Sequence, residues 1–88
     1  MQAESGSGSV YGSTYTANLG FKPTRVLIAI YSDTNNLMRM AFNDTIKGID
    51  TLVIDGNGNK LTITDTGFTF YVYAGFGTCN FYWLAVKD

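Results

Sequence analysis

The sequence contains no histidine and a single cysteine, Cys79, and charged residues make up only 15% of it. Histidine is the commonest general base and metal ligand, and without it Cys79 lacks the partner that would activate a thiol. One cysteine cannot form an internal disulfide, and the apolar segment around it predicts a buried, inert thiol. These absences argue against an enzyme, and we expect no metal and no cofactor.

The six Lys and Arg residues form no basic run, and the formal net charge is −1. Binding to nucleic-acid phosphates needs clustered Lys and Arg, so we expect no nucleic-acid partner. No apolar run is long enough to span a bilayer, and the first residues have no basic segment followed by an apolar one. We therefore expect a soluble chain without membrane insertion or an export signal.

The acidic residues inside the domain are mostly followed or preceded by Asn, Gly or Thr, where short polar side chains cap turns. Residues 55–59 (Asp-Gly-Asn-Gly-Asn) superficially resemble a calcium-binding loop. The twelfth position of that loop, where an EF-hand has glutamate, is Thr66, and the flanking segments have strand composition. Because Asn-Gly is a preferred hairpin turn pair, we predict a turn there, with a metal site as the weaker alternative.

What is abundant is apolar and aromatic surface. Hydrophobic residues make up 45% of the chain, and there are six Phe, six Tyr and one Trp. In the apolar segment 24–31 both alternating faces are apolar, and segment 78–86 becomes apolar on both faces towards its end. A domain of this size that leaves a second apolar face in water is prone to association, so we predict a homo-oligomer. These features do not separate a dimer from a trimer.

Residues 1–9, rich in Ser and Gly, have the composition of a flexible linker or an added junction, and residues 10–88 are expected to form one β domain. No segment has apolar residues at helical spacing, and ten glycines punctuate the chain. We predict an all-β fold, a small antiparallel β-sandwich of about six or seven strands. The expected strands are residues 10–19, 24–31, 37–43, 51–55, 60–64, 67–74 and 78–86.

Alternation assigns faces to these strands. In the last two segments, Phe68, Phe70 and Val72 share one face, as do Phe81 and Trp83, and the short Gly-containing connection predicts that the two segments form a hairpin. In segment 37–43 the apolar phase predicts that Met38, Met40 and Phe42 face inward and Arg39 outward.

Aromatic surface with a few polar anchors is a common basis for binding carbohydrate. Phe76 lies at the expected hairpin tip between two glycines, where we expect it to be exposed. The polar loop 32–36 supplies Asp33, Asn35 and Asn36, and Arg39 follows on the next strand. We predict these five residues as the ligand-binding site, whereas for Tyr71 we favour a position in a subunit interface.

Several short motifs resemble the C-terminal receptor-binding domains of phage and prophage tail-fibre or minor tail proteins. They are residues 21–23 (Phe-Lys-Pro) before 26–28 (Val-Leu-Ile), the step 64–68 (Thr-Asp-Thr-Gly-Phe), and the closing strand 82–86 (Tyr-Trp-Leu-Ala-Val). The same pattern resembles the H-type lectins, and the similarity covers about residues 19–86.

This resemblance implies an H-type-lectin-like sandwich that trimerises at the tip of a viral fibre and recognises a bacterial surface glycan. The family takes sugar contacts from a loop acid, an arginine and an aromatic residue, for which the counterparts here are Asp33, Arg39 and Phe76. It further implies a virion tail protein made in the host cytoplasm. The alternatives are a structural trimerisation or virion-decoration domain with no ligand and, third, an enzyme.

Overall fold

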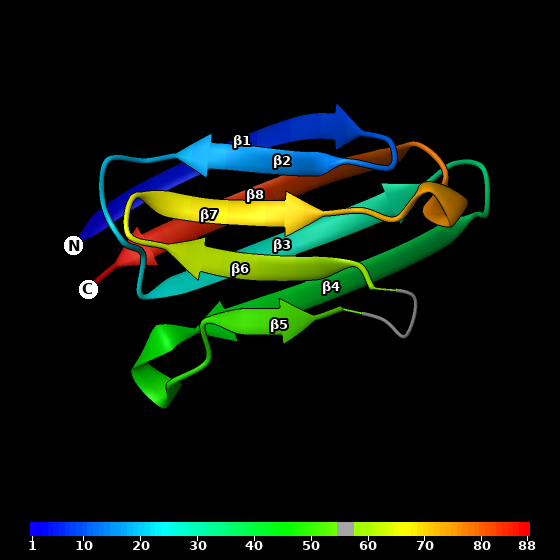
Figure 1. Ribbon diagram of the computed structural model, residues 1–88. Helices are drawn as coiled ribbons and strands as arrows, with labels where there is room; N and C mark the ends of the chain where they lie inside the picture. Colours follow the sequence, from blue (N-terminus) through cyan, green and yellow to red (C-terminus); the bar gives the residue numbers. More distant parts are fainter. Residues whose placement is uncertain (55–57) are drawn as a thin grey trace.

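The computed structural model describes residues 1–54 and 58–88; residues 55–57, inside the turn predicted at 55–59, lie outside the described residues. Two antiparallel four-stranded sheets lie face to face (Figure 1), which confirms the all-β class and is compatible with a small β-sandwich. Sheet A has the order β1 (Gln2–Val10), β8 (Cys79–Lys87), β3 (Arg25–Ser32) and β4 (Leu37–Asp44). Sheet B has the order β2 (Thr14–Asn18), β7 (Gly67–Tyr71), β6 (Lys60–Thr64) and β5 (Thr51–Val53).

Two short 3₁₀ helices, η1 (Thr45–Lys47) and η2 (Ala74–Phe76), connect strands of different sheets. Neither crosses a membrane, and no helix among the described residues has the length and apolar character to do so. Each is a single turn that redirects the chain from one sheet to the other. A helix of one turn leaves most of its backbone groups to form hydrogen bonds with its surroundings.

The core lies between the two sheets and includes the two aromatic faces that alternation assigned to β7 and β8. Aromatic rings meet across the layers in edge-to-face arrangements, which such rings prefer: Phe68 of β7 lies 5.1 Å from Trp83 of β8, and Phe70 lies 5.5 Å from Phe81. The aliphatic part of this core comprises Val26, Ile28, Ile30, Leu61, Ile63, Val72 and Ala85.

The segment expected to be a linker forms strand β1 instead. It pairs with β8 along its whole length, from Gln2 opposite Lys87 to Val10 opposite Cys79. Its inward positions Gly6 and Gly8 leave room for the large rings of β8, while its serines face outward. The Gly-Ser composition of β1 therefore reflects close packing against aromatic rings, although a flexible linker has the same composition. With β1 included, eight strands are present in the described part of the chain, rather than six or seven.

The two final strands do not form the predicted hairpin. β7 pairs with β2 and β6 in sheet B, whereas β8 pairs with β1 and β3 in sheet A, so the chain crosses from one sheet to the other through η2. Figure 1 shows this crossing at the end of the sandwich where β3 also turns into β4. Gly77 follows η2 with a φ of 82°, a left-handed conformation that glycine adopts without strain.

Strand β4 has the opposite phase to the one predicted. Ala41 and Asn43 are buried, whereas Met38, Met40 and Phe42 are exposed on the outer face of sheet A. β4 is an edge strand of a sheet whose outer face is itself apolar, so its larger side chains lie on that outer face. Hydrophobicity alone assigned the wrong face because both faces of this sheet are apolar.

Candidate functional site

The turn between β3 and β4 contains three of the five predicted ligand-binding residues, and it is fastened to η2. The amide of Asn35 donates hydrogen bonds to the backbone oxygens of Gly75 (3.1 Å) and Phe76 (2.9 Å). The hydroxyl of Ser32, which is fully buried, donates to the same Phe76 oxygen. Asn35 therefore serves to join two connections of the fold, since its donors are already used by the backbone.

Phe76 is buried, and this corrects the expectation of an exposed aromatic residue at a hairpin tip. Its side chain is 0% exposed and lies 6.2 Å from the ring of Tyr73, with which it packs edge to face. The reason is the crossing between sheets: η2 closes the end of the sandwich, and the ring of Phe76 points into the core. Phe76 cannot stack on a ligand from outside.

Arg39 is exposed but does not join the turn residues. Its Cα lies opposite that of Ile30, a core residue, so it projects on the inward face of the edge strand β4 rather than outward as predicted. Its guanidinium donates to the backbone oxygen of its neighbour Met38 at 2.9 Å. An inward-pointing charge on an edge strand is a common device against edge-to-edge pairing, and this accounts for Arg39 without a ligand.

Asp33 and Asn36 are exposed, and each is hydrogen-bonded to a residue that lines a hollow, which we call the tyrosine hollow. Asn80 donates to the carboxylate of Asp33 at 3.4 Å, and the hydroxyl of Tyr31 donates to the side-chain oxygen of Asn36 at 3.3 Å. The hollow has a volume of about 450 Å³. Its lining comprises Ala29, Ile30, Tyr31, Met38, Asn80 and Tyr82.

Of the residues predicted for the ligand site, the structure thus brings Asp33 and Asn36 to one hollow and places Asn35, Arg39 and Phe76 elsewhere. Sequence reasoning missed Tyr31, Asn80 and Tyr82. The alternation that assigned Phe81 and Trp83 to the core also placed Asn80 and Tyr82 on the opposite face, so the signal for these two was present.

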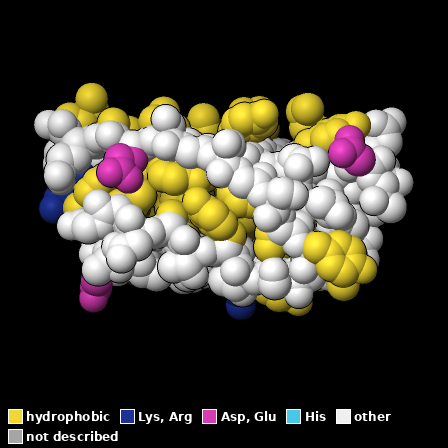
Figure 2. Space-filling view, turned by 90° about the horizontal axis from the view of Figure 1, so that it is seen from above, with side chains coloured by type: hydrophobic (Ala, Val, Ile, Leu, Met, Phe, Trp, Pro, Cys, Tyr) yellow, Lys and Arg dark blue, Asp and Glu magenta, His cyan; other side chains and the backbone are white. Residues whose placement is uncertain are grey.

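The tyrosine hollow lies at one end of a larger surface, the apolar face, formed by Leu27, Met38, Met40, Phe42, Tyr82 and Leu84. The register of sheet A makes it continuous: Leu27 has Phe42 on one side and Leu84 on the other, and Ala29 lies between Met40 and Tyr82. Met38, Met40 and Tyr82 are 65%, 66% and 70% exposed. Figure 2 shows hydrophobic side chains projecting along the upper edge of the molecule, on the sheet A side.

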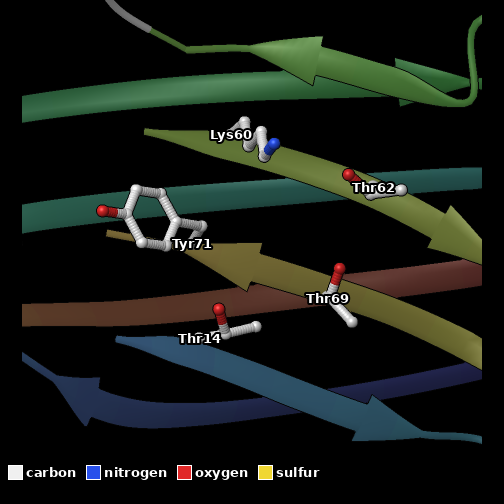
Figure 3. Close-up of a pocket in the computed structure, with 5 residues that line it drawn as sticks. All are labelled: Thr14, Lys60, Thr62, Thr69 and Tyr71. Atoms are coloured by element: carbon white, nitrogen blue, oxygen red, sulfur yellow. The ribbon is translucent and has the colours of Figure 1, made fainter. Parts of the chain in front are cut away.

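The outer face of sheet B is polar by contrast. Thr14, Thr62, Thr69, Lys60 and Tyr71 line a depression of about 270 Å³ there, which we call the threonine basin (Figure 3). The two outer surfaces of the sandwich thus differ in chemistry: one carries the apolar face, and the other is rich in hydroxyl groups.

The Cys79 thiol is buried, and the carboxylates of Asp44 and Asp88 are paired with Arg25. Burial raises the pKa of the Cys79 thiol to about 11, although a backbone hydrogen bond from Tyr31 acts in the opposite direction. Asp44 caps η1 through the amide of Ile46 (2.9 Å) and pairs with Arg25 at 3.6 Å, and Arg25 also pairs with Asp88. No group of three potential metal ligands occurs among the residues that the structure describes.

Comparison of the chain with models of protein families, with curated proteins and with solved structures finds no significant match.

Proposed function

We propose that the domain is a non-catalytic recognition module that associates into a homotrimer and binds carbohydrate on a bacterial surface, as part of a phage-type tail fibre or minor tail protein. The observation that carries this proposal is the outer face of sheet A, where an exposed apolar surface ends at an aromatic hollow with a carboxylate and an amide at its rim. In this role the protein belongs to the virion tail and is made in the host cytoplasm.

The apolar face supports association between copies of the same chain. Monomeric soluble proteins rarely expose a continuous apolar patch of more than a few hundred Å². The positions of the apolar face carry no charge, and the neighbouring outward positions of β1 are Ser5, Ser7 and Ser9. A second copy offers the same uncharged surface, so that association needs no partner of complementary charge.

The tyrosine hollow supports carbohydrate as the ligand. The ring of Tyr82, which is 70% exposed, offers an apolar surface of the kind that covers one side of a sugar ring, and Tyr31 lines the same hollow. The carboxylate of Asp33 can accept hydrogen bonds, and the side-chain amide of Asn80 can both donate and accept them. Sugar hydroxyl groups need both kinds of partner. Because the hollow is continuous with the apolar face, a neighbouring protomer would border it, as the H-type-lectin-like arrangement implies.

One observation favours the second candidate, a structural trimerisation or virion-decoration domain without a ligand. Two of the residues expected to contact sugar, Asn35 and Phe76, have structural roles in joining the β3–β4 turn to η2. Under this alternative the apolar face still holds copies together, but the hollow is only the edge of that interface.

A glycan-binding assay on the intact oligomer separates the two candidates. Asn80→Ala removes a polar group from the hollow without changing the apolar face, and Asn18→Ala, an exposed strand asparagine on sheet B, is the matched control. The proposed function predicts binding to at least one bacterial glycan, weakened by Asn80→Ala and unchanged by Asn18→Ala, with the oligomer mass constant. An intact oligomer that binds no glycan would instead establish the structural alternative.

A further inference from the structure

The outer face of sheet B has an ordered row of hydroxyl groups. Thr16 of β2 lies opposite Thr69 of β7, which lies opposite Thr62 of β6, which lies opposite Thr51 of β5. The next row along the strands places Tyr71 between Thr14 and Lys60. This face therefore presents hydroxyl groups from four adjacent strands, with one aromatic ring and one ammonium group at its end.

The threonine basin is formed where these two rows meet. Figure 3 shows the hydroxyls of Thr62 and Thr69 and the ammonium of Lys60 pointing towards the same space above β6 and β7, with the ring of Tyr71 standing at one side. Lys60 is exposed and forms no ion pair with any residue that the structure describes, whereas Arg25 is paired with Asp44 and Asp88. The basin thus combines an exposed positive charge, several hydroxyls and an aromatic wall.

We propose that the threonine basin is a second saccharide site, specific for a sugar ring that bears a carboxylate. A lysine ammonium has three donors and no acceptor, and its hydrogen bonds to a carboxylate are stronger than those to a neutral hydroxyl. Threonine hydroxyls donate and accept, which matches the hydroxyls of a pyranose ring, and the Tyr71 ring covers the apolar side of that ring. The basin lacks the planar guanidinium fork that recognises phosphate or sulfate through paired hydrogen bonds.

This site remains accessible in the proposed assembly, because it lies on sheet B while the copies associate through sheet A. Since the ligand class is a saccharide, the inference rests on the proposed function, but its residues are entirely separate from those of the tyrosine hollow. The two sites can therefore be tested independently on the same protein.

The experiment compares a uronic acid trisaccharide with its methyl ester, which keeps the shape and removes the charge. Binding is measured by calorimetry, and its location by NMR shifts of the amides of Thr62, Thr69 and Tyr71. Lys60→Gln removes the charge and Thr69→Val removes one hydroxyl at nearly constant shape, while Lys22→Gln changes an exposed lysine that is not part of the basin. Thermal unfolding of each variant verifies that it is folded.

We expect the acid to bind with a Kd about tenfold lower than that of the ester, and Lys60→Gln to raise the Kd for the acid by about tenfold. Lys22→Gln should leave the Kd unchanged, and the preference for the acid should shrink as salt is raised, because an exposed ion pair is screened. Thr69→Val should weaken acid and ester alike.

Equal binding of acid and ester, or a Kd unaffected by Lys60→Gln, would overturn the inference. Tighter binding of a sulfated trisaccharide than of the uronate would overturn its commitment to a carboxylate. If the uronate and neutral saccharides alike shift only the amides of Asn80 and Tyr82, this inference fails and the proposed function stands. If no saccharide of either charge binds, both fail together.

Discussion

Gly6 of β1 lies directly opposite Trp83 of β8, and the indole ring occupies the space that a side chain at position 6 would need. A Cβ added at Gly6 would lie 2.6 Å from Cζ2 of Trp83, and one added at Gly8 would lie 2.7 Å from Cζ of Phe81. The two aromatic side chains that form the centre of the core therefore extend under β1. Glycine at these positions allows β1 to complete sheet A.

Gly6→Val should destabilise the domain, because the new side chain and the Trp83 ring cannot both fit. We expect a loss of about 1–3 kcal/mol in the free energy of unfolding, measured by denaturant titration. Amide hydrogen exchange should quicken along β8, since β1 protects that strand by backbone pairing. Ser7→Val, at the outward-facing position next in sequence, is the control; an equal loss in both variants would contradict the packing of Gly6 under Trp83.

Phe76→Ala should cost about 3–5 kcal/mol in the free energy of unfolding, because it removes a fully buried ring. The comparison is Tyr11→Ala, which truncates a 62% exposed aromatic side chain and should change stability by about 0.5 kcal/mol or less. Denaturant titration of both variants measures the difference. A Phe76→Ala protein as stable as the parent would mean that the ring is at the surface.

The Cys79 thiol should react slowly in the folded protein. Its pKa is raised from 9.0 to about 11, so the thiolate fraction near pH 8 is about a hundredfold lower than in the unfolded chain, and the side chain is inaccessible. Reaction with a thiol reagent, with and without denaturant, measures this contrast. Rapid labelling of the native protein at pH 8 would show that Cys79 is accessible.

The same shift makes stability depend on pH in a known direction. A folded-state pKa above the ordinary value means that the unfolded chain loses its proton first, so stability is fully present below about pH 9 and falls as pH rises towards 11. Cys79→Ala removes the thiol and with it this pH dependence. The free energy of unfolding of the variant should therefore fall less than that of the parent between pH 8 and pH 10.5. Parallel curves for the two proteins would contradict a buried neutral thiol.

Alternation grouped Phe68 with Phe70 in β7 and Phe81 with Trp83 in β8, and these aromatic faces do form the core. It was insufficient for β4, where the larger apolar side chains lie outside and the inward positions are Leu37, Arg39, Ala41 and Asn43. Both faces of sheet A carry large apolar side chains, so hydrophobicity cannot distinguish the core from the exposed apolar face.

Local composition also could not distinguish two other features. The Gly-Ser strand β1, which packs against Trp83 and Phe81, has the composition of a linker. Only its pairing with β8 distinguishes it from one. A glycine-containing connection fits a hairpin as well as a crossing between sheets. Here it forms the crossing from β7 to β8, with the Phe76 side chain buried. Of the five residues predicted for a ligand site, only Asp33 and Asn36 are hydrogen-bonded to residues of the tyrosine hollow.

We propose that copies of this chain cover the apolar face of sheet A for one another. Met40→Lys places a charge among the apolar positions of that face, between Met38 and Phe42 on β4, and Ser7→Lys places one on β1, outside the apolar positions. An interface of this kind does not tolerate an unpaired charge among its buried apolar side chains, whereas a charge at the rim has little effect.

Light scattering coupled to size exclusion is the most direct test. We predict a mass three times the 9.6 kDa of the chain for the parent and for Ser7→Lys, and a mass of one chain for Met40→Lys. A parent protein that remains at the mass of one chain at every concentration measured would contradict the account.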